Sequence, residues 1–299
     1  MAKETLPPGV HVALVTPMTP DADVDVEGAR RLVEYVLAGG VHGLNIMGST
    51  GEVASLSEPK RRKVVDTVIQ AANGRVPAIA AVCQNTVEDA IKEIKALQSQ
   101  GLKGALLLVP SYYPLPPAGI ESFYRSVADK VTLPILIYNI PPFTKVVVPP
   151  DVVASLAKDG VVAGIKDSSR DFEYFSQVRF KTLGIEGFKM FIGSDTQLLG
   201  SMMIGGDGTI AGAPNVGPKL DVGLYNAVRA QEWEKAAKLQ KQVFELVMAV
   251  RCGAFPAGIK AGMELLGICS GRPVPPIPAV SPAEKEKLAV ALKALGILS

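Results

Sequence analysis

Short apolar runs separated by segments of helical period are the feature that most limits how this chain folds. Eight such runs recur before residue 212, and most are continuous rather than alternating between apolar and polar positions. Continuous runs of this length are typical of parallel strands that are buried on both faces. The runs occupy residues 12–15, 43–47, 78–82, 105–109, 135–138, 161–165, 188–192 and 208–211.

Amphipathic segments lie between these runs, for example at residues 26–38, 59–72, 87–100, 118–129, 150–157 and 172–183. Strict alternation of strand and helix predicts parallel strands joined by right-handed helical crossovers. Eight repeats at a spacing of roughly 30 residues favour closure into a barrel, because open doubly wound sheets usually have fewer strands. We therefore predict an α/β fold, a (β/α)8 TIM barrel.

The C-terminal stretch contains helical patterns only, at residues 231–250, 257–266 and 282–295. It has too few candidate strands to form a second α/β domain. We predict a barrel over residues 1–230 and a helical extension over residues 231–299, packed on the barrel within a single structural unit.

The charge of the chain argues against nucleic acid as a partner. Thirty-one Lys and Arg against 29 Asp and Glu leave a net charge of +2, without the clustered excess that binding to a phosphate backbone requires. Residues 60–63 are all basic, but they follow the helix start Ser57-Glu58-Pro59 and point around a helix rather than along one face. We interpret them as a solvated helix surface.

The chain also offers little to a membrane, a metal or a nucleotide. No stretch reaches the roughly 18 apolar residues of a membrane span, and the N-terminus has no apolar signal segment. Its three cysteines form no CxxC pair, and its two histidines, His11 and His42, lack metal-site spacing. Neither a Walker loop nor GxGxxG occurs after the first strand. We expect a cytoplasmic protein without metal or other cofactor.

Lys166 is the most informative residue, because it closes the apolar run at residues 161–165, where an unpaired ammonium is costly. In a barrel, functional side chains project from the carboxyl ends of strands. One interpretation is an ion pair with a neighbouring carboxylate such as Asp167. The other is an amine nucleophile, because desolvation favours the neutral amine. An imine between this amine and a 2-oxo acid would let carbon–carbon bonds form or break without a metal.

Two further features fit that chemistry. Tyr138 ends the adjacent predicted strand and is a candidate proton shuttle, although a packed aromatic with a satisfied hydroxyl is the alternative. The loop at residues 48–51 offers backbone N–H groups and two hydroxyls, which suit a carboxylate or a phosphate. A plain turn before a helix would use the same residues. Gly48, Ser49 and Thr50 are therefore candidate anion-binding residues.

Four motifs spread over essentially the whole chain carry a family resemblance. They are Gly48-Ser49-Thr50-Gly51-Glu52, Tyr112-Tyr113, Tyr138-Asn139-Ile140-Pro141 and Gly164-Ile165-Lys166-Asp167. In this order and spacing they resemble the dihydrodipicolinate synthase and N-acetylneuraminate lyase family of class I aldolases, which form Schiff bases with pyruvate.

The resemblance implies roles for individual residues. Lys166 would form the Schiff base and Tyr138 would relay protons. Ser49 and Thr50 would bind the carboxylate of the 2-oxo acid. The carbonyl of Ile210 would face the substrate, and Tyr113 would reach into a neighbouring subunit's site beside Ser49. The resemblance further implies a homotetramer built as a dimer of dimers.

Departures from the family pattern bear on the substrate. Phe143 stands two residues after the Pro of Tyr-Asn-x-Pro, where synthases of the lysine pathway carry an Arg that holds a substrate carboxylate. Loss of such a partner is not conservative. Asp195 matches a position from which neuraminate lyases bind a sugar hydroxyl, but Thr196 and Gly212 replace their Glu and Ser. We predict a lyase that cleaves or forms a 4-hydroxy-2-oxo acid from pyruvate and an aldehyde, in particular a 2-keto-3-deoxy sugar acid.

Other activities stay open at this point. The same imine serves a 4-hydroxy-tetrahydrodipicolinate synthase, an enzyme that joins pyruvate to aspartate semialdehyde. It also serves a neuraminate lyase-like enzyme or a dehydratase. A 2-oxo acid sensor without turnover belongs to a different class. The presence of both Lys166 and Tyr138 argues against the sensor.

Overall fold

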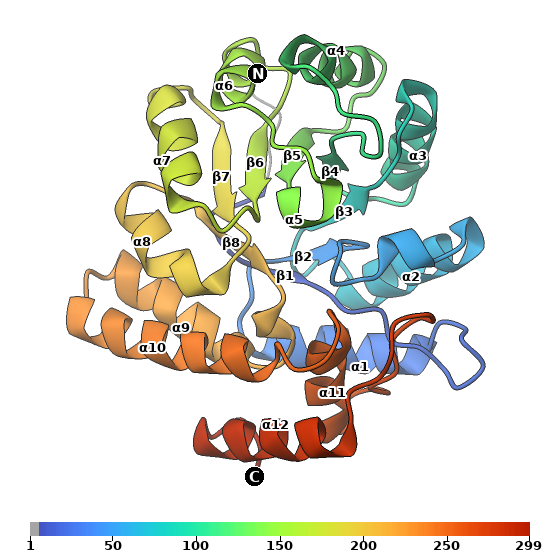
Figure 1. The fold of residues 1–299 in the computed structure, drawn as a ribbon, viewed down its shortest axis with the longest axis vertical. Coiled ribbons are helices and arrows are strands. Elements are labelled where there is room, and N and C mark those ends of the chain that lie inside the picture. The colour runs from blue at the N-terminus through green and yellow to red at the C-terminus, as the bar shows by residue number, and fades with distance from the viewer. Residues whose placement is uncertain (1–5) are drawn as a thin grey trace. The chain divides into compact units, whose positions relative to one another are not determined.

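The computed structural model describes residues 6–299 and has eight parallel strands that form a closed barrel in chain order (Figure 1). The TIM-barrel prediction is thereby confirmed. The strands are β1 (Gly9–Ala13), β2 (Gly43–Ile46), β3 (Ala78–Val82), β4 (Ala105–Leu108), β5 (Ile135–Asn139), β6 (Gly164–Asp167), β7 (Lys189–Ile192) and β8 (Gly208–Ala211).

Helices follow the strands and continue to the C-terminus, as predicted. They are α1 (Val26–Ala38), α2 (Glu58–Ala72), α3 (Val87–Ser99), α4 (Pro117–Ala128), α5 (Pro141–Thr144), α6 (Pro150–Lys158), α7 (Phe172–Lys181), α8 (Leu198–Met203), α9 (Pro218–Arg229), α10 (Trp233–Ala249), α11 (Ala257–Leu265) and α12 (Pro282–Ala294). Three short 3-10 helices are η1 (Val53–Ser55), η2 (Asp195–Gln197) and η3 (Ala213–Asn215). Within residues 6–299, no helix is long and apolar enough to cross a membrane.

Polar side chains fix where several helices begin. Asp25, Thr86 and Asp171 accept hydrogen bonds from backbone N–H groups in the first turns of α1, α3 and α7. Ser281 and Glu284 form a reciprocal capping box at the start of α12. Such caps satisfy N–H groups that have no partner inside the helix. The basic residues 60–63 lie within α2, as expected for a helix surface.

One strand differs from its prediction in a way that matters for the site. The run at residues 161–165 predicts a strand that ends just before Lys166, but β6 spans Gly164–Asp167. Val161 instead completes the turn after α6, because its N–H donates to the carbonyl of Leu156. Lys166 therefore lies inside the strand, where its backbone is held by both neighbouring strands.

The described chain consists of two compact units. The first contains residues 6–8 and 77–210, and the second contains residues 9–76 and 211–299. The division at residue 230 that the sequence suggested is a different kind of boundary and stays a prediction.

The first unit holds β3 to β7, most of β8 and the helices between them. Its core cluster consists of Leu6, Ile79, Ala81, Leu106, Leu108, Leu136, Tyr138, Ile140, Phe191 and Ile210. Side chains from β3, β4, β5, β7 and β8 meet in this one cluster, so these residues lie on the inward-facing sides of their strands. Helices α3, α4, α6 and α7 contact one another in that order (Figure 1).

The second unit pairs β1 with β2 and contains α1, α2 and α9 to α12. Helix α1 packs on α2, α9 packs on α10, and α12 packs on both α10 and α11. Asn215 of η3 ties the C-terminal part of this unit to the end of β1. Its side chain accepts a hydrogen bond from Val15 N at 3.0 Å and donates to the carbonyls of Ala13 and Gly212, each at 2.8 Å.

Candidate active site

Lys166 and Tyr138 form a buried pair in the first unit. The register of β5 and β6 places these two residues directly opposite each other. Lys166 Nζ donates a hydrogen bond to Tyr138 Oη at 3.1 Å and lies 4.2 Å from the centroid of the ring. Each residue is only 2% exposed. The structure thus brings together the predicted nucleophile and the predicted proton shuttle.

Asp167 and Asn139 form a second pair on the other face of the same two strands. Side chains alternate along a strand, so the residues next to Lys166 and Tyr138 point away from them. Asn139 Nδ2 donates to Asp167 Oδ1 at 2.8 Å, and Ser169 donates to the same carboxylate through its N–H and its hydroxyl. Burial raises the pKa of Asp167 to about 6, against the lowering effect of these hydrogen bonds.

This second pair tests the ion-pair interpretation of Lys166. The Asp167 carboxylate is occupied by Asn139 and Ser169, and no carboxylate among residues 6–299 lies within ion-pair distance of Lys166. The ion pair with Asp167 that the sequence left open is therefore wrong. Strand alternation is the physical reason, because neighbours in sequence face opposite sides of a sheet.

In the second unit, residues 48–52 form a tight turn after β2. Gly51 N donates to Gly48 O at 2.9 Å, and Glu52 N donates to Ser49 O at 3.1 Å. The residues at both ends of the turn, Met47 and Glu52, have φ values of 59° and 60°. A left-handed conformation is costly for residues with a Cβ and concentrates at functional sites.

The turn presents donors that the protein itself does not use. Among residues 6–299, the N–H groups of Gly48 and Thr50 and the Thr50 hydroxyl donate to no protein acceptor. Thr50 is only 6% exposed, and Ser49 is half-buried. Converging N–H and O–H groups of this kind are suited to an anion such as a carboxylate.

A buried ion pair anchors this turn. Lys260 Nζ, from α11, donates to Glu52 Oε2 at 2.6 Å, and the side chains are 0% and 1% exposed. The other carboxylate oxygen, Oε1, accepts from Val274 N at 2.6 Å. Burial lowers the pKa of Lys260, while the Glu52 carboxylate opposes that shift. Both oxygens of Glu52 thus hold the turn to its own unit, one to α11 and the other to the segment between α11 and α12.

The other predicted site residues lie in the first unit in different surroundings. Ile210 is buried in the same interior cluster as Tyr138. Asp195, at the start of η2, is 5% exposed and accepts a hydrogen bond from the Thr209 hydroxyl at 3.4 Å. Phe143, on α5, is 54% exposed. Tyr113 is 74% exposed and its ring packs edge-on against Tyr112. The predicted contact of Tyr113 with a neighbouring subunit therefore involves a surface residue.

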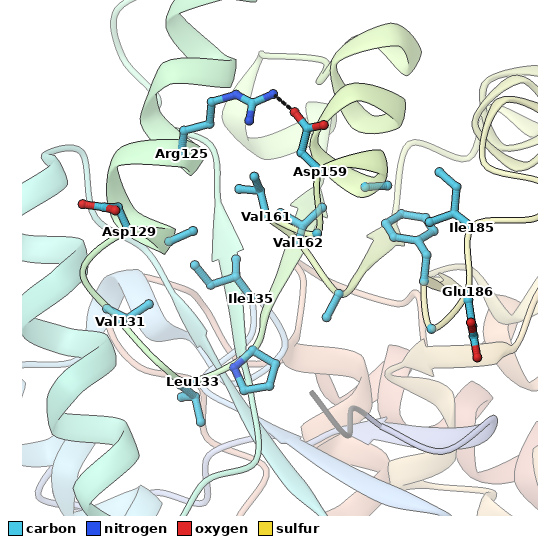
Figure 2. Close-up of a pocket in the computed structure, with 17 residues that line it drawn as sticks. Arg125, Asp129, Val131, Leu133, Ile135, Asp159, Val161, Val162, Ile185 and Glu186 are labelled. Atoms are coloured by element: carbon cyan, nitrogen blue, oxygen red, sulfur yellow. Dashed lines mark hydrogen bonds and ion pairs between the residues drawn. The ribbon is translucent and has the colours of Figure 1, made fainter. Parts of the chain in front are cut away.

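A cleft of about 640 Å³ opens elsewhere in the first unit, at the amino ends of β5 and β6 (Figure 2). Apolar residues such as Val131, Ile135 and Val162 form its wall, and Arg125 pairs with Asp159 at 2.8 Å near its edge. Lys166 and Tyr138 are not part of its lining. Lys166 and Tyr138 lie toward the carboxyl ends of these strands, which is where barrel enzymes in general have their active sites.

Comparison with known proteins agrees with this geometry. Residues 6–295 match the dihydrodipicolinate synthetase family. This chain belongs to that family. The 4-hydroxy-tetrahydrodipicolinate synthase of Phenylobacterium zucineum is 36% identical over 290 residues, covering 97% of this chain and 98% of its own length. The enzyme of the same name from Methanosarcina mazei is 33% identical, covering 97% and 99%.

Solved structures of the family have the same fold. Dihydrodipicolinate synthase from Thermotoga maritima superposes with a TM-score of 0.94 at 29% identity, covering 98% of this chain and 100% of its own. YagE, a prophage protein of the family from E. coli K12 solved in complex with pyruvate, has a TM-score of 0.92 at 26% identity, covering 97% and 98%.

Family membership settles the class of the protein. Members are Schiff-base-forming carbon–carbon lyases, so this protein is an enzyme of that class that acts on small molecules. The prediction of a 2-keto-3-deoxy sugar acid as substrate is not supported by these relatives. Their names favour the synthase that the sequence analysis kept as an alternative.

Sequence reasoning missed the partner of Glu52. The motif that carries the resemblance includes Glu52, but Lys260 lies 208 residues further along the chain. The only sequence signal is that Lys260 sits within an otherwise apolar stretch, between Ile259 and Ala261, as Lys166 also does. Any lysine in such a setting needs a structural or a chemical reason.

Proposed function

We propose that the protein forms an imine between Lys166 Nζ and the keto carbon of a 2-oxo acid, with pyruvate as the first candidate. The observation that carries this proposal is the buried Lys166, which lies 3.1 Å from the Tyr138 hydroxyl and has no carboxylate partner in residues 6–299. A buried amine without a counter-charge has the setting that nucleophilic lysines need.

The reaction follows from these two side chains. The amine adds to the keto carbon, and the keto oxygen leaves as water, which gives the imine. Loss of a proton from the methyl carbon gives an enamine, whose carbon attacks the aldehyde carbon while the aldehyde oxygen takes up a proton. Hydrolysis of the imine then releases the product and restores Lys166. Tyr138 is within hydrogen-bonding distance of Nζ and would carry the protons.

The carboxylate of the 2-oxo acid would bind the turn at residues 48–50. The free N–H groups of Gly48 and Thr50 and the hydroxyls of Ser49 and Thr50 support this role, as does the family resemblance. The Ile210 carbonyl is assigned to the substrate on the resemblance alone. Hydrogen bonds from the turn to a carboxylate would be charge-assisted, and such hydrogen bonds are the strong ones.

The first candidate for the aldehyde is aspartate semialdehyde, which would make the protein a 4-hydroxy-tetrahydrodipicolinate synthase. Relatives up to 36% identical over nearly the full length bear this name. A second candidate is a hydroxylated aldehyde, so that the product is a 2-keto-3-deoxy sugar acid. It is favoured by Phe143, an exposed apolar residue in the place where the synthases carry an Arg. Neuraminate lyase-like and dehydratase activities would use the same imine.

The active form would be a homotetramer, a dimer of dimers, in which Tyr113 reaches the site of a neighbouring subunit. The support is the exposure of two adjacent large aromatic residues, Tyr112 at 86% and Tyr113 at 74%. Exposed aromatic residues are enriched at protein interfaces. A cytoplasmic location stays a prediction.

Borohydride trapping tests the proposal directly. The protein is incubated with pyruvate and borohydride, digested, and its peptides are mapped by mass spectrometry. A reduced pyruvate adduct on Lys166 is expected, and a folded protein without this adduct would refute the proposal. Turnover is then compared between aspartate semialdehyde and hydroxylated aldehydes, with Phe143→Arg as the paired variant. Unchanged preference in Phe143→Arg would exclude a role for this residue in choosing the aldehyde.

A further inference from the structure

Asn45, on β2, is a fully buried amide that the protein does not satisfy. It is 0% exposed, and neither Nδ2 nor Oδ1 has a hydrogen-bond partner among residues 6–299. In the orientation that the structure shows, Nδ2 meets no acceptor and Oδ1 meets no donor among these residues. The backbone of Asn45 is well paired, since its carbonyl accepts from Leu14 N at 3.0 Å. Only the side chain lacks partners.

A second buried asparagine in the same unit shows that this is unusual. Asn215 is also 0% exposed, but its side chain makes three hydrogen bonds, with Val15 N, Ala13 O and Gly212 O. Buried polar groups in native proteins are nearly always paired, and exceptions tend to mark functional positions. Leu at position 45 would fill similar space without leaving polar atoms unpaired, so the amide calls for another explanation.

The Asn45 amide lies directly beside the anion-binding turn. A Cβ built on Gly48 would come within 2.9 Å of Asn45 Nδ2, and apart from Gly48 and its two chain neighbours no other residue of the described chain has a heavy atom within 4 Å of that position. Gly48 is the first residue of the turn, and its own N–H is one of the donors that lack a protein acceptor. The missing side chain of Gly48 is therefore what brings the amide next to the turn.

We propose that Asn45 is a further substrate-binding residue, whose side-chain NH₂ donates a hydrogen bond to the carboxylate of the 2-oxo acid held by residues 48–50. This inference rests on the proposed function. It adds a neutral donor from a rigid strand to the backbone and hydroxyl donors of the turn, and a donor held by a strand is positioned more sharply than one on a loop. A hydrogen bond between an amide and a carboxylate also supplies the partner that Asn45 lacks in the free protein.

The test measures the pyruvate concentration that gives half-maximal borohydride trapping on Lys166. In Asn45→Leu this concentration is expected to rise about tenfold, equivalent to about 1.4 kcal/mol. Hydroxyacetone, in which a hydroxymethyl group replaces the carboxylate, is trapped in parallel and its half-maximal concentration should not change. The melting temperature of the ligand-free variant should equal or exceed that of the wild type, because an unpaired buried amide has been removed. If Asn45→Leu does not fold, the same measurements are made on Asn45→Ala, which adds no bulk.

The outcomes separate this inference from the function on which it rests. A wild-type protein without a Lys166 adduct overturns both. A wild-type adduct combined with an unchanged pyruvate concentration in the Asn45 variant overturns the inference alone. Equal shifts for pyruvate and hydroxyacetone also overturn it, because they would mean that Asn45 only shapes the turn. The variant Asn215→Leu serves as the structural comparison, since it should lower the melting temperature through its lost hydrogen bonds.

Discussion

Among residues 6–299, each of the two units contains one buried lysine, and the two lysines have different kinds of partner. Lys260 is 0% exposed and pairs with the Glu52 carboxylate at 2.6 Å. Lys166 is 2% exposed and contacts the hydroxyl of Tyr138 at 3.1 Å. Within the described residues, Lys166 has no carboxylate partner. Both lysines are buried, but Lys260 contacts a carboxylate and Lys166 contacts a phenol hydroxyl.

Under the proposed mechanism, this difference separates a structural lysine, Lys260, from a reactive one, Lys166. In a buried ion pair the lysine nitrogen stays bonded to its carboxylate, and removal of either residue leaves the other as a buried charge without a partner. A phenol hydroxyl makes no such demand and can take up or give back a proton as the nitrogen changes its bonding. A lysine buried in an apolar segment therefore has either a structural or a chemical role. The group that its nitrogen contacts indicates which of the two roles it has.

The strongest way to break this comparison is to remove each lysine in turn. Lys166→Ala should abolish turnover, with a loss on the order of 10⁶-fold as for other covalent nucleophiles. It should leave the melting temperature close to that of the wild type. Steady-state kinetics together with thermal unfolding provide both numbers. Retained turnover in Lys166→Ala would end the imine mechanism.

Removal of the hydroxyl from Tyr138 tests the partner of the reactive lysine. Tyr138→Phe should lower kcat by about 10²- to 10⁴-fold, the range for a positioned proton-transfer group. The ring still packs in the interior cluster, so the fold should be preserved. The check is kcat with circular dichroism as the folding control. Turnover equal to that of the wild type would reduce Tyr138 to a packing residue.

The structural lysine should show the reverse behaviour. Glu52→Leu or Lys260→Met alone should lower the free energy of unfolding by about 3–5 kcal/mol, because each leaves a buried charge unpaired. The double variant Glu52→Leu with Lys260→Met should regain a large part of this loss, although Val274 N still loses its acceptor. Denaturant unfolding of all three variants measures the coupling. Additive effects of the two single changes would show that the pair is not coupled.

The pH dependence of stability tests whether Asp167 is independent of Lys166. The pKa of Asp167 is raised by burial to about 6, so between about pH 4 and pH 6 the unfolded chain binds fewer protons at this site than the native protein. Stability contributed by the protonated carboxyl is thus present below pH 4 and falls as the pH rises to 6, by roughly 2–3 kcal/mol. Asp167→Asn should remove this fall and Lys166→Met should keep it. A fall that becomes larger in Lys166→Met would restore the discarded ion pair, because a paired ammonium lowers the pKa of the carboxylate and its removal raises that pKa.

Sequence patterns anticipated most of the fold because its strands are continuous apolar runs and its helices carry clear caps. The eight runs and the three C-terminal helices all correspond to observed elements. Boundaries were less certain. Residues 161–163 look like strand but lie before β6, and Val161 completes the turn after α6 through its hydrogen bond to Leu156, since hydrogen bonding rather than hydrophobicity decides where a strand begins.

The site was predictable to the extent that it uses local motifs. Lys166 and Tyr138 were found because each ends an apolar run, and strand pairing does bring them together. Lys260 and Asn45 were not found. The partner of Lys260 is 208 residues away, and the importance of Asn45 lies in hydrogen bonds that it does not make, which no sequence pattern records.

The register of β5 and β6 makes imine formation a reporter of correct assembly. Tyr138 faces Lys166, and Asn139 faces Asp167 on the opposite side. A slip of one strand by a single residue would exchange the two faces and turn the amine away from the phenol. A slipped chain could still be compact and rich in secondary structure, yet borohydride would not label it. The fraction of molecules that trap pyruvate would then count those with the native register, which gives refolding or strand-redesign experiments a chemical readout that spectroscopy lacks.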